Sequence, residues 1–333
     1  METKNKIKTI RSFVKEVDMV GDSLLSISEI TDEQIYSLFR LAKALEPWNR
    51  SKVELLPDKV LVTIFFQPST RTRMSFETAM QRLGGSVVSE ADPMTTSSAA
   101  KEETLADMMK VVSKYANVIV LRHPDDREAL EGSGYADCPV INGGFGDWEH
   151  PTQALLDLYT LWRIHGHIEG LNVCVASPDL VAARTGHSMA HGLTRLGAKV
   201  TLATQKDKRT PEKVREKMDD EKGDYEEVFN LKQDEFNDLV KGMDLVYLPG
   251  CSAPKGPESE AFKEIMDNYY VHLDTLDAVY QKTGKNVRIT HTLPRREGEM
   301  DKSIDTSRHQ QYFEAISYSV SLRMALLAAV VGM

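Results

Sequence analysis

The segment KVLVTIFF (residues 59–66) runs directly into QPSTRTR (residues 67–73), and this junction decides the fold. The first run is nearly continuous in apolar and β-branched residues, which predicts a buried strand of a parallel sheet. The second run begins an amphipathic helix that ends at Gly84-Gly85. The apolar positions of this helix are Met74, Ala79, Met80 and Leu83.

A polar turn between a strand and a helix start predicts an anion site. Unpaired backbone N–H groups, the positive end of the helix dipole, hydroxyls and a guanidinium converge there. The turn matches neither a glycine-rich phosphate loop nor the dinucleotide fingerprint. Taken alone, it is equally compatible with a solvated helix start capped by Ser69.

Strand and helix patterns alternate along the rest of the chain. Thr31-Asp32-Glu33-Gln34 is a capping box that begins the first clear helix. Strands are predicted at 59–66, 86–89, 117–121, 139–141, 171–176, 199–203, 244–248 and 287–290, with long helices at 150–165 and 311–331. The charged segment 205–241 is interpreted as solvated helical surface. Two blocks of alternation predict an α/β protein with two doubly wound parallel-sheet domains.

Polar motifs follow several of the predicted strands. In open α/β sheets, ligands bind beyond the carboxyl ends of the strands. Three such motifs occur in the first half, at 69–73, 122–124 and 142–150, and three in the second, at 176–184, 248–252 and 291–295. Their shared position favours a binding site over scattered solvated residues.

Composition narrows the class of protein. The formal net charge of -9 argues against general nucleic-acid binding and against an anionic membrane surface. Cys138, Cys174 and Cys251 lie far apart, without the spacing of zinc ligands or of a disulfide framework, and the first two are expected in the core. The N-terminus lacks the apolar segment of a signal peptide, and no stretch approaches a membrane span. We therefore expect a cytoplasmic protein without a metal or cofactor.

Six motifs lie in order over nearly the whole chain: 69–73 (STRTR), Lys101 with 103–107 (ETLAD), 122–124 (RHP), 150–153 (HPTQ), 184–185 (RT) and 291–295 (HTLPR). In their order and spacing, these motifs resemble the aspartate and ornithine carbamoyltransferases. The sequence of residues 150–158 and the Leu-Pro-Arg ending of the last motif are more similar to the aspartate branch than to the ornithine branch. Such a resemblance implies a carbamoyltransferase fold whose C-terminal helix packs back on the N-terminal domain.

The resemblance also implies two domains and a role for each site residue. Residues 1–150 with 309–333 would bind carbamoyl phosphate, and 151–308 would bind the amino-acid acceptor. Phosphate would be held by Ser69, Thr70, Arg71 and Thr72, the carbonyl oxygen by Thr72, Arg122 and His150, and the carbamoyl NH2 by Gln153 and the backbone carbonyl of Leu293. The catalytic set is Arg71, Thr72, Arg122 and His150. The acceptor would meet Arg184, Thr185, Ser252, Lys255, Leu293 and Arg295.

Two further implications concern the assembly and the backbone. Ser97 and Lys101 would come from a neighbouring subunit, which implies a homotrimer with shared active sites and leaves larger assemblies open. Leu293-Pro294 would be a cis peptide.

The chemistry of carbamoyl transfer suits these residues. A neutral amine attacks a carbonyl, an oxyanion must be stabilised, and phosphate leaves. Positioned donors and cations meet those needs without a covalent intermediate, a metal or a cofactor. His150 is expected to act as a neutral donor, because a cation beside two arginines is disfavoured. The departing phosphate can take the amine proton, so no general base is assigned.

Departures from the aspartate branch cluster on acceptor recognition. That branch is expected to have Arg-x-Gln where this chain has Gly250-Cys251-Ser252. Gly provides neither the bidentate hydrogen-bonding geometry nor the positive charge of Arg. Lys255 could reach a carboxylate only as a point charge. Gln67 stands where Glu is usual, Thr292 replaces a proline, and Glu102 replaces a glycine.

Four hypotheses for the function follow. By overall resemblance the best single acceptor is L-aspartate, as in pyrimidine biosynthesis. The alternative is a different amine, such as an ornithine derivative or a ureido-amine. A non-catalytic scaffold is disfavoured because the predicted donor site is intact, and a nicotinamide-dependent oxidoreductase because neither half opens with the glycine fingerprint.

Overall fold

The chain forms two compact units. The structure, a computed structural model, describes residues 2–250 and 258–333. The first unit runs through Tyr159 and resumes at Ile316, and the second is Thr160–Ala315.

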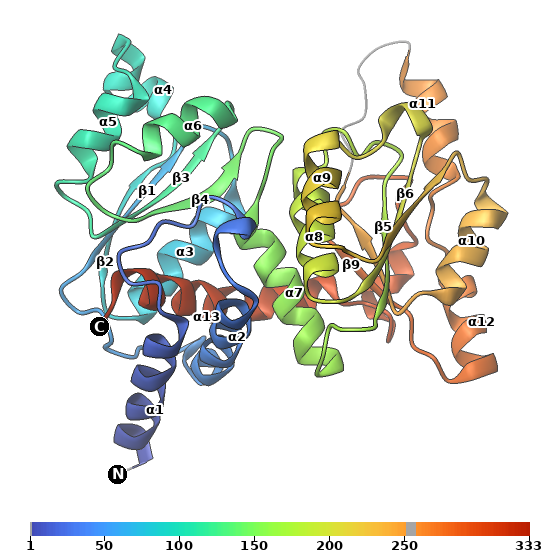
Figure 1. Cartoon of the computed structure of the whole chain (residues 1–333), viewed down its shortest axis with the longest axis horizontal. Helices are drawn as coiled ribbons and strands as arrows, with labels where there is room; N and C mark the ends of the chain where they lie inside the picture. Colours follow the sequence, from blue (N-terminus) through green and yellow to red (C-terminus); the bar gives the residue numbers. More distant parts are fainter. Residues whose placement is uncertain (1, 251–257) are drawn as a thin grey trace. The chain divides into compact units, whose positions relative to one another are not determined.

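The first unit is a parallel sheet in the order β2-β1-β3-β4 (Figure 1). Its elements are α1 (Glu2–Val17), α2 (Asp32–Leu45), β1 (Val60–Phe65), α3 (Thr70–Arg82), β2 (Ser86–Glu90), α4 (Pro93–Thr96), α5 (Leu105–Val112), β3 (Val118–His123), α6 (Asp126–Ser133), β4 (Val140–Phe145), the start of α7 (Pro151–His165) and most of α13 (Tyr312–Val331). Helices α5 and α6 pack on one face of the sheet through Met108, Met109 and Ala129, against Ile64 and Ile119.

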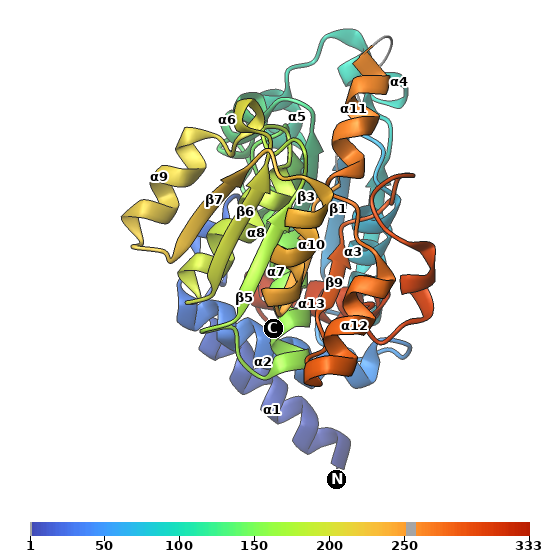
Figure 2. The same cartoon turned by 90° about the vertical axis from the view of Figure 1, so that its right-hand side faces the viewer.

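The second unit is a parallel sheet in the order β7-β6-β5-β8-β9. Its elements are β5 (Asn172–Ala176), α8 (Arg184–Arg195), β6 (Lys199–Thr204), α9 (Glu212–Asp220), β7 (Tyr225–Phe229), α10 (Gln233–Gly242), β8 (Leu245–Leu248), α11 (Glu258–Asp267), α12 (Leu273–Thr283) and β9 (Arg288–His291). Figure 1 shows α8 and α9 on one face and α10 and α12 on the other, and Figure 2 shows β7, β6 and β5 side by side. The predicted class, two doubly wound parallel sheets, is confirmed.

The units divide later in the sequence than the predicted boundaries at 150 and 309. The first nine residues of α7 belong to the first unit, where the Tyr159 hydroxyl donates to Glu46 at 2.5 Å. The chain returns to that unit only at Ile316, inside α13.

Helix α13 packs in the first unit, as the resemblance implied. The Gly21 N–H donates to the Val330 carbonyl at 2.9 Å, and Asn49 donates to the Ser317 carbonyl at 3.1 Å. By length and composition alone, Tyr312–Val331 could span a bilayer, contrary to the sequence-based expectation, but 67% of its apolar window is buried. That burial is typical of a core helix in a globular protein.

Two elements were missed or misread from the sequence. Segment 205–241 was interpreted as helical surface, but it also contains the strand β7. This strand lies at the edge of the sheet and pairs with β6. An edge strand tolerates charged residues such as Glu226 and Glu227. Because of these charges, the sequence pattern did not indicate a strand. Helix α1 precedes the first predicted helix, and it buries Ile10, Val14 and Val17 at helical spacing.

Two side chains lie farther out than predicted. Met74, assigned to the apolar face of α3, is 53% exposed. Cys138 is half-buried, while Cys174 is fully buried as expected, and both are free thiols. Burial raises the pKa of Cys138 to about 11, which keeps that thiol protonated at neutral pH.

The capping box at Thr31 forms in full and allows a stability test. The Thr31 hydroxyl accepts from the Gln34 N–H at 3.1 Å, and the Gln34 side chain accepts from the Thr31 N–H at 2.8 Å. We expect Thr31→Ala to lower the free energy of unfolding by about 1 kcal/mol, because an N–H at the start of α2 loses its acceptor. Chemical denaturation measures this. Thr31→Ser keeps the hydroxyl and should lose little, so equal losses in the two variants would contradict the capping role.

Candidate active site

The predicted phosphate-binding turn lies beside the end of a neighbouring strand in the first unit. Phe65 at the end of β1 pairs with Arg122 on β3, and the Phe66 N–H donates to the Arg122 carbonyl at 2.9 Å. Helix α3 begins at Thr70, after Ser69 at its N-cap, and the Ser69 side chain makes no capping hydrogen bond. The first N–H groups of a helix have no partner within it, so this edge presents donors to an anion.

His150 and Thr72 meet at the same edge of the sheet. The Thr72 hydroxyl lies 3.4 Å from His150 Nε2, and the Thr152 hydroxyl lies 3.3 Å from Nδ1. Thr72 and His150 are each 5% exposed. A hydroxyl can donate or accept, so both contacts suit a neutral imidazole that keeps one N–H for donation.

The two arginines differ in their surroundings. Arg122 is half-buried and donates from Nη1 to the Gly143 carbonyl at 3.1 Å, which ties its side chain to β4. Desolvation lowers the pKa of Arg71, although its side chain as a whole is exposed. Because an arginine stays protonated at neutral pH even then, Arg71 presents a weakly hydrated cation next to Thr72.

Gln153 lies one turn into α7, and a carboxylate fixes its amide. Its Nε2 donates to both carboxylate oxygens of Asp157, each at 3.1 Å. Asp157 is four residues farther along the same helix and is 2% exposed. The carbonyl end of the Gln153 amide therefore points away from Asp157.

Ser97 and Lys101 belong to a separate segment after β2. Ser97 lies between α4 and the 3₁₀ turn Ser98–Lys101; its hydroxyl donates to the Pro93 carbonyl at 2.8 Å and accepts from the Ala99 N–H at 3.1 Å. The structure therefore gives Ser97 a local capping role and shows no contact between Ser97 and the residues above. Glu102, predicted to replace a glycine, has a φ of 65° in the left-handed region.

In the second unit, a backbone carbonyl joins two of the loops that follow strands. The Pro249 carbonyl accepts from the Thr292 hydroxyl at 2.7 Å and from the Thr185 hydroxyl at 3.4 Å. Arg184 is the first residue of α8, and Gly250 has a φ of 75° in the left-handed region that favours glycine. The residues predicted to bind the acceptor thus include several at the carboxyl edge of this sheet.

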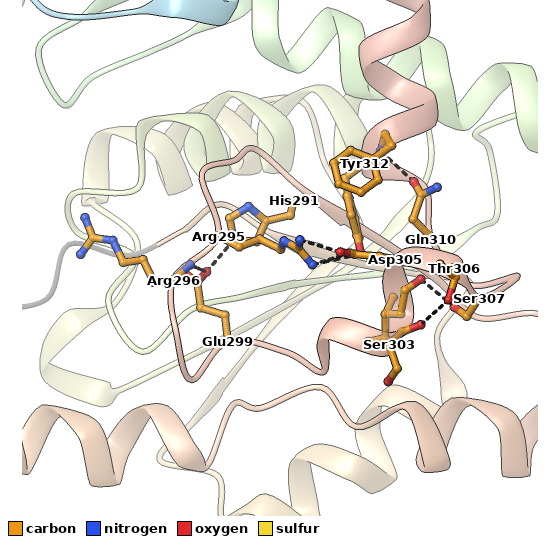
Figure 3. A network of polar contacts seen from close by, with 12 residues as sticks. His291, Arg295, Arg296, Glu299, Ser303, Asp305, Thr306, Ser307, Gln310 and Tyr312 are labelled. Atoms are coloured by element: carbon orange, nitrogen blue, oxygen red, sulfur yellow. Dashed lines mark hydrogen bonds and ion pairs between the residues drawn. The ribbon is translucent and has the colours of Figure 1, made fainter.

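Leu293 is held in place by the buried His291, which Figure 3 shows beside Glu299. Its N–H donates to His291 Nδ1 at 2.7 Å, and His291 Nε2 contacts the Glu299 carboxylate at 2.9 Å. Glu299 also accepts from the Arg296 N–H at 2.6 Å. These bonds support a φ of 57° at Leu293, and the Leu293-Pro294 peptide is cis as predicted.

Arg295 is already paired within the second unit. Figure 3 shows its guanidinium facing the Asp305 carboxylate, with one N···O contact of 2.8 Å and a shorter one beside it. The Tyr312 hydroxyl also donates to Asp305, and the Tyr312 ring centroid lies 5.2 Å from the guanidinium carbon. Hydrogen bonding to Asp305 raises the pKa of Arg295. An acceptor carboxylate at Arg295 would have to compete with Asp305.

Two predicted acceptor-binding residues, Ser252 and Lys255, lie outside the residues that the structure describes. Over 2–250 and 258–333, no group of three or more His, Cys, Asp or Glu side chains could hold a metal ion.

Family models match both units of the chain. The model of the aspartate/ornithine carbamoyltransferase carbamoyl-phosphate-binding domain matches residues 22–163, and the model of the Asp/Orn-binding domain matches residues 169–330. The chain belongs to the aspartate/ornithine carbamoyltransferase family.

Relatives of this carbamoyltransferase differ in their acceptors. A ureidoglycine carbamoyltransferase of Rubrobacter xylanophilus is 65% identical over 98% of this chain and 96% of its own length. The aspartate carbamoyltransferase catalytic subunit of Methanococcoides burtonii is 36% identical over 93% of this chain and 97% of its own. The catalytic subunit of M. jannaschii aspartate transcarbamoylase has a TM-score of 0.79 at 34% identity, covering 93% of this chain and 99% of that one.

These matches decide the class of enzyme. The protein is a carbamoyltransferase, so the scaffold and oxidoreductase hypotheses are wrong. Aspartate as acceptor is not confirmed, and the ureido-amine alternative fits the most identical of these relatives better.

The structure adds three carboxylates that sequence reasoning did not select. Asp157 had a local signal, since it lies four residues after Gln153 on one helix face. Glu299 and Asp305 had none, because each reaches its partner, His291 or Arg295, across a turn whose path the sequence does not specify.

Arg71 offers a direct test of the phosphate site. We expect Arg71→Ala to lower turnover with any acceptor by on the order of a hundredfold to a thousandfold, because charge developing on the leaving phosphate loses its cation. Phosphate release from carbamoyl phosphate measures this. Arg11→Ala, which removes an exposed arginine on α1, is the matched control. Retained activity in Arg71→Ala would show that the phosphate site is misplaced.

Proposed function

We propose that this enzyme transfers the carbamoyl group of carbamoyl phosphate to the amine of ureidoglycine, a ureido-amine, with release of phosphate. The 65% identity to the Rubrobacter ureidoglycine carbamoyltransferase, against 36% to an aspartate enzyme, carries the proposal.

The chemistry of the acceptor agrees with the residues present. Ureidoglycine is an α-amino acid whose side group is a neutral ureido function, whereas the side chain of aspartate ends in a carboxylate. A bidentate arginine suits a carboxylate, and a neutral ureido group needs hydrogen-bond donors and acceptors instead. The sequence Gly250-Cys251-Ser252, in place of the Arg-x-Gln expected in the aspartate branch, supplies no such cation.

The donor residues suit the transfer step. The amine nitrogen forms a bond to the carbamoyl carbon, and the bond from that carbon to the phosphate oxygen breaks. In the proposal, Ser69, Thr70, Arg71 and Thr72 bind the phosphate. Thr72, Arg122 and His150 donate to the carbonyl oxygen, where negative charge develops. The departing phosphate takes the amine proton, and the product carries two ureido groups on one carbon.

The carboxylate shared by all α-amino acids is assigned to Arg184, Thr185 and Arg295, with Leu293, Ser252 and Lys255 as the other proposed acceptor contacts. Because Asp305 already pairs with Arg295, binding at Arg295 requires this ion pair to rearrange. Arg184 at the start of α8 adds a second cation beside free helix N–H groups.

An acceptor panel tests the proposal. We expect kcat/KM for ureidoglycine to exceed that for aspartate by about a hundredfold or more, because an unpaired side-chain carboxylate would be desolvated without a cation. Phosphate release is measured with ureidoglycine, aspartate, ornithine and N-acylated ornithines. An aminal carbon readily expels ammonia, so the reverse reaction from diureidoacetate and phosphate serves as a second assay. Strong turnover with aspartate alone would overturn the ureido assignment.

We also propose that the enzyme works in the cytoplasm as a homotrimer in which Ser97 and Lys101 complete a neighbouring subunit's site. Lys101→Ala and His150→Ala subunits should each be inactive alone. Mixing them should restore about a quarter to a third of the wild-type activity, because some sites then receive both wild-type residues. Phosphate release after subunit exchange, verified with a tagged subunit, is the measurement. Absence of recovery would contradict shared sites.

A further inference from the structure

Two side chains of opposite charge, Asp157 and Arg323, are buried in the first unit, and Asp157 contacts Gln153. Arg323 on α13 is 1% exposed, and Asp157 on α7 is 2% exposed. Burial lowers the pKa of Arg323 to about 10, an effect that the negative charge of Asp157 opposes, so Arg323 stays charged at neutral pH. The guanidinium carbon of Arg323 lies 5.5 Å from the ring centroid of Phe76 on α3. Arg323 on α13 therefore contacts α3, and the negative charge of Asp157 on α7 acts on it.

The burial of these two charges is not explained by stability alone. Desolvation of two charges usually costs as much as their attraction returns, and well-packed apolar residues often stabilise a core better. In addition, Nε and Nη1 of Arg323 make no hydrogen bond. The Asp157 carboxylate, in contrast, accepts two hydrogen bonds from the Gln153 amide.

The orientation of the Gln153 amide matters for chemistry. Its two ends have almost the same shape, but one donates and the other accepts. A carbamoyl NH2 only donates, so it needs the carbonyl end. An ionised carboxylate only accepts, so Asp157 attracts the NH2 end of Gln153 and turns the carbonyl end the other way.

We propose that Asp157 is a positioning residue whose carboxylate fixes the Gln153 amide and so makes the site select a carbamoyl phosphate over an acyl phosphate. The proposal rests on the proposed function and on the placement of Gln153 against the carbamoyl NH2 that the family resemblance implies. An acyl phosphate carries a methyl group where carbamoyl phosphate carries its NH2, and a methyl group offers nothing to the Gln153 carbonyl.

Two stable analogues measure this selection directly. Phosphonoacetamide and acetonylphosphonate have the same shape and charge and differ only in NH2 against CH3. We expect the wild-type enzyme to bind phosphonoacetamide about tenfold more tightly, as one net hydrogen bond allows. The competitive inhibition constants against carbamoyl phosphate give the ratio, which does not depend on the fraction of enzyme that is folded.

Asp157→Asn should reduce the preference to about threefold or less, because an amide at this position can itself turn and no longer enforces one orientation of Gln153. The loss should fall on phosphonoacetamide and leave acetonylphosphonate unchanged within about twofold. A purely structural role would weaken both analogues equally, and that result would overturn the proposal. Asp137→Asn removes a surface ion-pair carboxylate of the same unit and serves as the matched control.

A charge swap gives a second test. Gln153→Glu alone places two carboxylates together and should abolish the preference. Combined with Asp157→Asn, the introduced carboxylate can accept from the new amide and from the carbamoyl NH2. The preference should then return to at least about fivefold, even if both analogues bind more weakly. A double variant without preference would count against the positioning role.

Further variants keep the proposal testable if Asp157→Asn does not fold. They also distinguish the positioning role of Asp157 from the proposed placement of carbamoyl phosphate against Gln153. If Asp157→Asn does not fold, Asp157→Glu should keep the preference and Asp157→Gln should lose it, since these two replacements differ only in carboxylate against amide. The opposite order would overturn the proposal. Gln153→Leu should also lose the preference. If Gln153→Leu keeps the preference, the proposed placement of carbamoyl phosphate against Gln153 is wrong. If Gln153→Leu loses the preference but Asp157→Asn keeps it, only the positioning role of Asp157 is wrong.

Discussion

The hydrogen-bond register between β1 and β3 determines where the residues proposed to bind carbamoyl phosphate lie. Because Phe65 pairs with Arg122, the strand that leads into the Ser69–Thr72 turn ends beside the strand that carries Arg122. Side chains alternate between the two faces of a strand, so a slip of one residue would turn Arg122 to the opposite face. The buried apolar residues of β1 and β3 fix this register, and in that sense the core of the sheet positions the proposed phosphate site.

The proposed acceptor specificity depends on one arginine that is already paired with a carboxylate and on another arginine that is absent. Arg295 is paired with Asp305, so the cation that the sequence offers to an acceptor is engaged inside its own unit. A paired arginine attracts a second carboxylate less strongly than an open one, because part of its charge is neutralised. The absence of an arginine at Gly250 agrees with the proposed acceptor, which has one carboxylate and a neutral ureido group.

Features governed by local physics were predictable from the sequence. The Thr31 capping box, the start of α7 and the ends of most strands follow from short-range patterns, and the structure reproduces them within a few residues. Strand β7 was not predictable in this way, because its charged residues are tolerated only at a sheet edge. The partners of Gln153, His291 and Arg295 depended on helix register or on turns, and the alignment of motifs with the family said nothing of carboxylates outside those motifs.

The discontinuity of the first unit has a consequence for biosynthesis. The second unit, Thr160–Ala315, is one continuous stretch, so its core can form while the chain is still being made. The first unit needs Ile316–Met333, which leaves the ribosome after the whole of the second unit. Until then the apolar surface that α13 covers is open, and Phe76 lacks its contact with Arg323. Chaperone binding during synthesis should therefore concentrate on the half of the protein that is translated first.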